Sequence, residues 1–330
     1  MNYLKNLDSI FSDFNGKRVV IVGDIMVDKY VIGKVDRVSP EAPVPVVDVS
    51  HLDSRLGGAG NVALNIKAMG GIPILCSVIG QDVEGDDLLE MLDKQGLYSK
   101  AILRSDKRKT TTKTRVIGNN HQLLRFDHEV KNDLDSLDSF LLQENYLREI
   151  ENCDVIIYED YNKGVLHSGN IENLIQLANN LNISTIVDPK KNNFLLYRNV
   201  TLFKPNLKEI KEGLNISSDL SNSDELQLAI QTLQEKLNNK ITMVTLSERG
   251  VLIATKNEWL SVPAHVRNIA DVSGAGDTVV SVAALCLASN LDLKLIAELS
   301  NLSGGLVCEK LGVVPIEKDQ LLSEAKRILA

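Results

Sequence analysis

The sequence lacks a surplus of basic residues, because its 36 Lys and Arg are outnumbered by 44 Asp and Glu, for a net charge of -8. Affinity for the phosphate backbone of nucleic acids needs clustered Lys and Arg, so a general nucleic-acid-binding protein is not expected. The chain also lacks an apolar run of membrane-spanning length, and residues 1–17 contain no apolar segment typical of a secretion signal. We therefore expect a cytoplasmic protein with no membrane partner.

Closely spaced cysteine pairs are missing as well. The four cysteines lie far apart and form no C-x-x-C motif: Cys76, Cys153, Cys286 and Cys308. This spacing argues against a zinc ribbon or a disulfide framework and favours free thiols in a reducing compartment. The sequence has no low-complexity tract or fixed-period repeat, and its 44% hydrophobic and 24% charged residues are typical of globular domains. A chain of this length can bury a large core.

Six short apolar runs each end in polar residues, which is the pattern of buried parallel strands with polar tips. These runs are KRVVIVGD (17–24), IPILCSVIG (72–80), DVIIYED (154–160), STIVDPK (184–190), VTLFKPN (200–206) and ITMVTLS (241–247). Helical patterns separate most of them, such as residues 60–71, 168–182 and 224–239. The alternation predicts an α/β fold, a mostly parallel sheet covered by helices on both faces, with ligands at the carboxyl ends of the strands.

Two stretches depart from this pattern, at about residues 30–50 and 97–127. Their segments YVIGKVDRVSPEAPVPVVDVS and KTTTKTRVIGNNHQLLRFD are rich in β-formers and turn residues and alternate more than the core strands do. We expect them to form a small antiparallel sheet inserted into the large domain. Pro43 and Pro45 indicate that one of its strands lies at an edge.

The segment DVSGAGDT (271–278) precedes an apolar run that is expected to be a helix. Glycines at 274 and 276 suit a tight turn, and the first N–H groups of a helix form a site for an anion. Asp277 is negative and would not serve merely to hold a phosphate. It could accept the proton of a hydroxyl that attacks a phosphoryl group. On this motif alone, a plain helix cap is an equally good interpretation.

This segment resembles the signature D-T-x-G-A-G-D of the ribokinase-like (PfkB) carbohydrate kinase family, with Val272 in place of the threonine. The resemblance covers nearly the whole chain. It implies a single domain over 1–330, a three-layer α/β/α sandwich with a small inserted β-sheet lid. It also implies that Asp277 is the catalytic base and that the amides of Gly274, Ala275 and Gly276 form the anion hole.

Sugar ligands are implied in the N-terminal half of the chain. Asp28 ends GDIMVD, and LGGAGN supplies Gly57, Gly58 and Asn61. Paired glycines allow close approach of the backbone to a sugar, and a carboxylate with an amide can bind hydroxyls; a tight turn followed by a helix cap is the alternative.

The spacing between Gly58 and Asn61 is one residue shorter than is usual in the family. This form and several further blocks resemble one branch, the D-glycero-β-D-manno-heptose 7-phosphate kinases of ADP-heptose synthesis. The further blocks are RVSPEAPVPVV, TTKTRVIGNNHQLLRFD, YEDYNKG and VDPKK.

ATP and Mg²⁺ are the implied phosphoryl donor and cofactor, and K⁺ is a further candidate ion. Asn206 and Glu209 lie three apart at a helix start and resemble the N-x-x-E motif, in which the glutamate binds magnesium through water; a capped helix with an acidic first turn is the alternative. TLSERG resembles the nucleotide loop T-x-G-x-x-G through Thr245 and Gly250, with Ser247 at the first glycine. Asn301 lies where the family contacts adenine, although packing explains it equally well.

The phosphate carried by the sugar must also be neutralised. Lys113, Arg115 and Arg125 alternate on the inserted sheet, and Arg37 and Lys163 lie in the blocks of the heptose kinase branch. Arginine can bind a phosphate through two hydrogen bonds, although such charges are often only solvated surface. Asp160 follows a strand and is a further candidate substrate ligand.

The resemblance implies ATP-dependent phosphorylation of a heptose 7-phosphate at its anomeric hydroxyl, and a homodimer formed through the lid. The five histidines form no H-x-G-H pair, so a nucleotidylyltransferase domain is not expected. Kinases of ribose, fructose or fructose 6-phosphate, and a non-catalytic sugar or nucleotide sensor, are the alternatives. A Rossmann dehydrogenase is disfavoured because no G-x-G-x-x-G follows the first strand.

Overall fold

A computed structural model describes residues 7–329 and contains a nine-stranded sheet in the order β13-β12-β11-β10-β9-β8-β1-β4-β5. The strands from β11 to β5 are parallel, and β12 and β13 are antiparallel additions at one edge. Their bounds are β1 Arg18–Gly23, β4 Ile72–Gly80, β5 Ile102–Ser105, β8 Val155–Glu159, β9 Ser184–Asp188, β10 Leu202–Phe203, β11 Ile241–Thr245, β12 Val251–Ala254 and β13 Trp259–Val262. All six predicted strands are therefore present.

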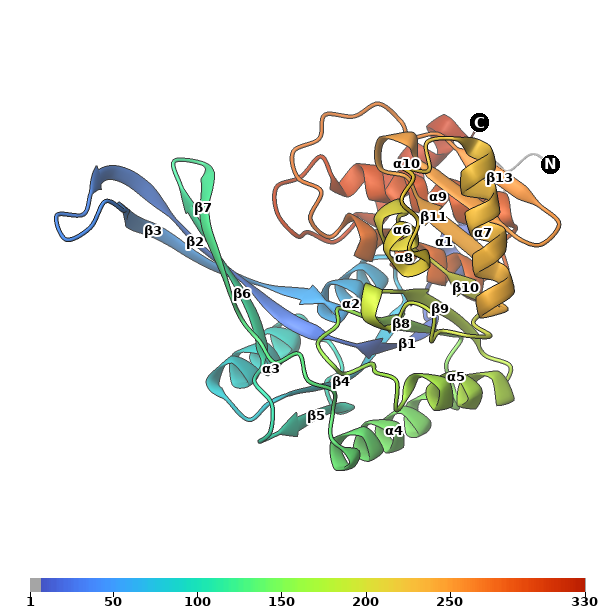
Figure 1. Cartoon of the computed structure of the whole chain (residues 1–330), viewed down its shortest axis with the longest axis horizontal. Coiled ribbons are helices and arrows are strands. Elements are labelled where there is room, and N and C mark those ends of the chain that lie inside the picture. The colour runs from blue at the N-terminus through green and yellow to red at the C-terminus, as the bar shows by residue number, and fades with distance from the viewer. Residues whose placement is uncertain (1–6, 330) are drawn as a thin grey trace.

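Helices cover both faces of this sheet and form the outer layers of a three-layer sandwich (Figure 1). Val19 and Ile21 of β1 point into one apolar core, whereas Val20 and Val22 point into the other, as the two-residue period of a strand requires. The first core contains residues of α1 Leu7–Asp13, α2 Ala59–Ala68, α3 Val83–Lys94, α8 Ala275–Ala288, α9 Leu293–Val307 and α10 Lys318–Ile328. The second contains residues of α4 Ser136–Ile150, α5 Ile171–Asn180, α6 Leu207–Leu214 and α7 Ser223–Leu237. Among residues 7–329, no helix combines the length and apolar character needed to cross a membrane.

A second, four-stranded sheet projects from one side of the sandwich, and we call it the small sheet (Figure 1). Its order is β3-β2-β6-β7, with β2 Ile25–Val38, β3 Pro45–Gly58, β6 Thr111–Gly118 and β7 His121–His128. The edge strand β3 begins at Pro45, as the prolines indicated. Three details differ from the expectation: β2 and β3 extend beyond 30–50, β6 is parallel to β2, and β5 pairs with β4 in the large sheet instead. The parallel pairing arises because the chain crosses the large domain before it returns.

The strand register gives the small sheet one polar and one apolar face, because residues paired across neighbouring strands share a side. Asp28 and Tyr30 of β2 lie on the polar face, whose paired residues are Arg55, Lys113, Asp127, Asp53, Arg115 and Arg125. Val31 of β2 lies on the opposite face, in a row with Leu52, Val116 and Leu124.

A single residue, Asp24, separates β1 of the large sheet from β2 of the small one. Its buried carboxylate accepts hydrogen bonds from the backbone N–H groups of Tyr161, Lys163 and Val165, at 2.8, 3.0 and 3.2 Å. Burial raises the pKa of Asp24, and these three bonds oppose that rise. The loop that follows β8 is therefore tied to the junction of the two sheets.

Candidate active site

Helix α8 begins at the glycine-rich segment identified in the sequence. Gly274 is its N-cap residue and has φ 79°, in the left-handed region that favours glycine. A Cβ atom at this position would lie 2.8 Å from Nδ2 of Asn61, so the close approach also requires glycine. This turn places Asp277 in the first turn of α8, where its side chain is 4% exposed.

Both carboxylate oxygens of Asp277 accept hydrogen bonds from neutral side chains. Nδ2 of Asn61 donates to one oxygen at 2.7 Å, and the hydroxyl of Tyr161 donates to the other at 2.8 Å. Burial raises the pKa of Asp277 to about 6, while these two hydrogen bonds act to lower it. The residue forms no ion pair within residues 7–329, so its carboxylate has the environment of a general base that works near neutral pH.

Two lysines from neighbouring strand ends lie beside the start of α8. Nζ of Lys204, which follows β10, is 3.1 Å from Oδ2 of Asp188, and Lys190 is 3.5 Å from the other oxygen of the same carboxylate. A Cβ atom at Gly276 would lie 3.7 Å from Oδ2 of Asp188 and 3.9 Å from Nζ of Lys204. Two ammonium groups and the N–H groups of a helix start therefore meet at one point, which is a suitable site for a phosphoryl group.

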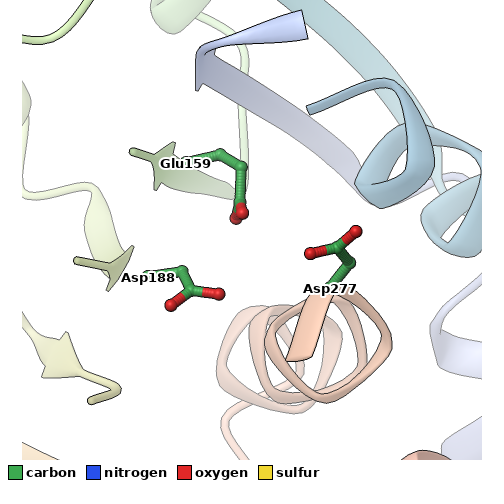
Figure 2. Close-up of side chains that lie close together, drawn as sticks. All are labelled: Glu159, Asp188 and Asp277. Carbon is green, nitrogen blue, oxygen red and sulfur yellow. The ribbon is translucent and has the colours of Figure 1, made fainter. Parts of the chain in front are cut away.

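Glu159 ends β8 and adds a further carboxylate to this edge of the sheet. Its side chain points into the same space as those of Asp188 and Asp277 (Figure 2). Burial raises the pKa of Glu159 well above its usual value, and the two neighbouring aspartates raise it further. Burial also acts to raise the pKa of Asp188, but Lys190 and Lys204 hold it below its usual value.

Asn206 and Glu209 form a complete capping box at the start of α6. The side chain of Asn206 accepts from the N–H of Glu209 at 2.9 Å, and Oε2 of Glu209 accepts from the N–H of Asn206 at 2.8 Å. Oε1 of Glu209 lies 3.1 Å from Nζ of Lys190. The capping box predicted by the alternative interpretation is therefore present. The capped glutamate also belongs to the cluster of charges around Lys190, and its contact with magnesium stays a prediction.

The nucleotide loop follows β11, and Thr245 pairs with Asn206 through an isolated parallel bridge. Ser247 has φ 53°, the left-handed conformation that glycine adopts without strain, which explains why the signature has glycine there. Gly250 ends the 3₁₀ turn of residues Ser247–Arg249. Asn301 donates to the carbonyl of Pro263 at 2.9 Å, so its amide is bonded within the protein itself.

The expected sugar ligands meet at the base of the small sheet. Arg115 donates to Oδ1 of Asp28 at 2.5 Å, and a Cβ atom at Gly57 would lie 2.3 Å from Oδ2 of the same carboxylate. A Cβ atom at Gly58 would lie 3.5 Å from the ring of Tyr161. Nζ of Lys113 lies 5.0 Å from the centre of that ring. Tyr161 thus lies between the small sheet and Asp277, to which its hydroxyl donates.

Two of the candidate substrate ligands are hydrogen-bonded within the protein. Asp160 is fully buried, and its oxygens accept from Tyr197, Asn193 and the N–H of Asn162. The side-chain amide of Asn61 donates to Asp277.

Two of the basic candidates are also placed differently. Lys163 is ion-paired with Glu129 at 2.6 Å. Arg37 is exposed near the far end of β2, nine residues from Asp28 and therefore about 30 Å away along an extended strand. It is not brought into the site of its own chain.

Five residues at the site were not identified from the sequence: Glu159, Tyr161, Asp188, Lys190 and Lys204. Each of them ends strand β8, β9 or β10 or lies one or two positions after it, in the quoted blocks YEDYNKG, VDPKK and VTLFKPN. Their position at strand ends was therefore the available signal.

A surface cavity of about 670 Å³ lies along α6, lined by residues such as Leu207, Lys208 and Lys211, and not in front of Asp277. In this conformation Asn61 and Tyr161 both donate to Asp277, whose side chain is nearly inaccessible to solvent.

The parallel sheet, the small sheet at its carboxyl edge and the buried Asp277 at a glycine-opened helix are the features of a ribokinase-like kinase. The profile of the pfkB family carbohydrate kinases matches residues 17–319, and the chain belongs to this family. Among solved structures, phosphofructokinase-2 from Escherichia coli in complex with potassium superposes with a TM-score of 0.80 at 21% identity, covering 95% of this chain and 99% of that one. Ribokinase from Arabidopsis thaliana, complexed with ribose and ATP, gives 0.73 at 14% identity, covering 93% and 99%.

Curated relatives are more similar in sequence. "Bifunctional protein HldE" of Caulobacter sp. is 39% identical over 315 residues, which cover 94% of this chain and 63% of that protein. The protein of the same name from Syntrophotalea carbinolica is 36% identical over 317 residues, covering 96% and 64%. The Helicobacter pylori protein is 36% identical over 296 residues, covering 90% and 64%. The chain thus spans slightly less than two thirds of the length of these relatives.

Proposed function

We propose that this protein transfers the γ-phosphoryl group of ATP to the anomeric hydroxyl of D-glycero-β-D-manno-heptose 7-phosphate, giving the 1,7-bisphosphate. The main support for this proposal is the position of Asp277. It is a buried carboxylate without an ion pair in residues 7–329, and it lies beside the helix start and the lysines that would hold a phosphoryl group. Membership of the pfkB family supports the reaction class. The choice of sugar rests on the relatives named HldE and on the sequence blocks of the heptose kinase branch.

In this reaction Asp277 takes the proton of the anomeric hydroxyl as its oxygen bonds to the γ-phosphorus. The bond between that phosphorus and the β–γ bridging oxygen breaks, and ADP leaves. The N–H groups at residues 274–277 and the ammonium groups of Lys190 and Lys204 stabilise the charge on the transferred group. Positioning and electrostatic stabilisation carry most of the catalysis in such transfers.

Magnesium bound with ATP would neutralise charge on the phosphates. Carboxylate oxygens are the ligands that Mg²⁺ prefers, and Glu209 is the carboxylate proposed to contact this ion. Both of its oxygens already have partners, one in the capping box and one at Lys190. This arrangement supports contact through water rather than direct coordination. Thr245, Gly250 and Asn301 remain the proposed nucleotide contacts, and dependence on K⁺ is tested by replacing KCl with NaCl in the assay.

Lys113 is the cation best suited to the phosphate of the sugar. Arg115 and Lys163 are engaged with Asp28 and Glu129, whereas Lys113 has no carboxylate within ion-pair distance in the described part of the chain. Burial lowers the pKa of Lys113, and a bound dianion would reverse that effect. Lys113 stands over Tyr161, which contacts the base, so a substrate could span the two. Asp28, Gly57 and Gly58 would bind hydroxyls between them.

The small sheet would act as a lid and as the interface of a homodimer. Its polar face carries Asp28 and Lys113, whereas its opposite face exposes an apolar row that includes Leu52 and Leu124. An apolar face of this kind on a projecting sheet suits burial against a second copy of the chain. In such a dimer, each polar face would be held over its own sugar site.

The cell compartment and pathway follow from the proposed substrates. ATP and sugar phosphates are cytoplasmic metabolites, and the four cysteines are free thiols, which fits a reducing compartment. The product would enter ADP-heptose synthesis for lipopolysaccharide or other surface glycans. We assign only the kinase reaction to these 330 residues, because they contain no H-x-G-H motif for adenylyl transfer.

An assay of ADP release across heptose 7-phosphate, fructose 6-phosphate, ribose and fructose tests the proposal. We expect the highest kcat/KM with heptose 7-phosphate. A preference for an unphosphorylated sugar would refute the substrate assignment but leave the kinase chemistry intact. Asp277→Asn should bind ATP normally and lose turnover by about 10²-fold or more, because general base catalysis contributes that much. Near-normal turnover of this variant would refute the role of Asp277.

A further inference from the structure

Three carboxylates from separate elements meet in the interior of the site. Glu159 ends β8, Asp188 ends β9 and Asp277 lies in the first turn of α8, and each turns its oxygens toward the same small space (Figure 2). One oxygen of each residue lies within 4.8 Å of the corresponding oxygens of the other two. All three side chains are buried.

Glu159 differs from the other two because its carboxylate has no hydrogen-bond partner in the described part of the chain. Asp188 is paired with lysines, and Asp277 accepts from Asn61 and Tyr161. Glu159 is 0% exposed, and neither of its oxygens has a hydrogen-bond partner within residues 7–329. A buried, unpaired carboxylate is unfavourable by several kcal/mol. Its presence, aimed at two other carboxylates, indicates that something not contributed by the protein compensates it.

The charges of the surrounding groups indicate what that partner is. Four carboxylates and two ammonium groups meet here: Glu159, Asp188, Glu209, Asp277, Lys190 and Lys204. When all are ionised, the carboxylates exceed the ammonium groups by two charges. One divalent cation removes this excess, and so would two protons. Three converging carboxylate oxygens provide the hard donor set that Mg²⁺ and Mn²⁺ prefer.

We propose that Glu159, Asp188 and Asp277 directly bind one divalent cation in the protein free of nucleotide and sugar. This site differs from the site of the ion that would accompany ATP. That ion would contact Glu209 through water, whereas the three carboxylates here would bind the cation directly. It deepens the proposed function, since it rests on Asp277 as the base: while the cation is bound, the carboxylate of Asp277 is engaged and unavailable to a sugar hydroxyl. Glu159 is the ligand whose replacement tests this site, because it has no other role in the proposed reaction.

The test uses Mn²⁺ as the probe and the full chain without ATP or sugar. Electron paramagnetic resonance of free Mn²⁺, read during titration, should give one bound ion per chain. Glu159→Gln should weaken that binding by about tenfold or more, since it removes the ligand and keeps the side chain's shape. Glu298→Gln, which alters a half-buried glutamate of α9, is the matched control and should bind Mn²⁺ as the unaltered protein does.

Thermal unfolding of the same samples gives a second readout and verifies folding. Mn²⁺ should raise the melting temperature of the unaltered protein and of the control, and should have little effect on Glu159→Gln, because an ion that binds only the folded state stabilises it. Equal Mn²⁺ affinity in Glu159→Gln and the unaltered protein, or no bound ion in either, would overturn the proposal and assign protons to the cluster instead. Neither result would affect the kinase assignment, which depends on turnover and on Asp277→Asn.

Discussion

Replacing Tyr161 with phenylalanine would remove one of the two hydrogen bonds that stabilise the ionised form of Asp277. The lost bond is the 2.8 Å contact from the tyrosine hydroxyl to Oδ1. Hydrogen bonds to charged groups contribute about 1.5–3 kcal/mol, and 1.36 kcal/mol corresponds to a tenfold change in proton affinity. Asp277 is the proposed base and must be deprotonated, so activity should fall as the pH falls through its pKa of about 6. In Tyr161→Phe, the midpoint of that acid limb should move upward by about one to two pH units.

The measurement is kcat/KM for the sugar phosphate between pH 5 and pH 9, because this parameter reports the ionisation of the free enzyme. Tyr161→Phe should lose most of its activity below neutral pH and regain it at higher pH. Tyr197→Phe is the matched control, since it removes a buried hydroxyl that donates to another aspartate, Asp160, at 2.7 Å. Its profile should keep the midpoint of the unaltered protein. An unmoved midpoint in Tyr161→Phe, in a folded variant, would refute the proposed control of Asp277 by Tyr161.

Three other variants test the remaining assignments. Lys113→Met should raise KM for the phosphorylated sugar by about tenfold or more and leave KM for ATP unchanged, as steady-state kinetics would show; an equal rise for unphosphorylated sugars would contradict a phosphate contact. Leu124→Arg should convert the proposed dimer to monomers in gel filtration, whereas Leu137→Arg, at a similarly exposed site on α4, should not; a persistent dimer would exclude this face as the interface. Gly274→Ala should destabilise the protein by about 1 kcal/mol or more in denaturant unfolding, because its φ of 79° strains alanine and its Cβ would meet Asn61; unchanged stability would show that the turn is less constrained.

The large sheet could be predicted from the sequence because its strands have a strong local signal. The apolar runs at 17–24 and 184–190 are buried on both faces, so they read as continuous hydrophobic segments with polar ends. The small sheet was harder to delimit. β2 follows β1 after only Asp24, and β5 is a four-residue strand, so neither boundary has a separate turn signal. The parallel pairing of β2 with β6 depends on the path of the intervening chain, which no local pattern encodes.

The site could be predicted where a residue belongs to a contiguous motif. Gly274 and Asp277 were identified from the DVSGAGDT segment, and the structure brings them to the start of a helix. The hydrogen bonds from Asn61 and Tyr161 to Asp277 were not predicted, because these residues lie 216 and 116 positions away and meet Asp277 only after folding. Glu159, next to the candidate Asp160, was not identified for a related reason. Side chains alternate along the chain at a strand end, so Glu159 points into the site while its neighbour points into the protein.

The junction at Asp24 connects the small sheet, which carries the proposed sugar ligands, to the loop after β8, which carries Tyr161. Strand β2 of the small sheet is joined to β1 through this residue, and the same carboxylate accepts hydrogen bonds from the backbone that carries Tyr161. If the small sheet closes over a sugar as proposed, this junction would couple the closure to Tyr161, whose hydroxyl donates to Asp277. Sugar binding would then alter a hydrogen bond that helps to set the pKa of the proposed base.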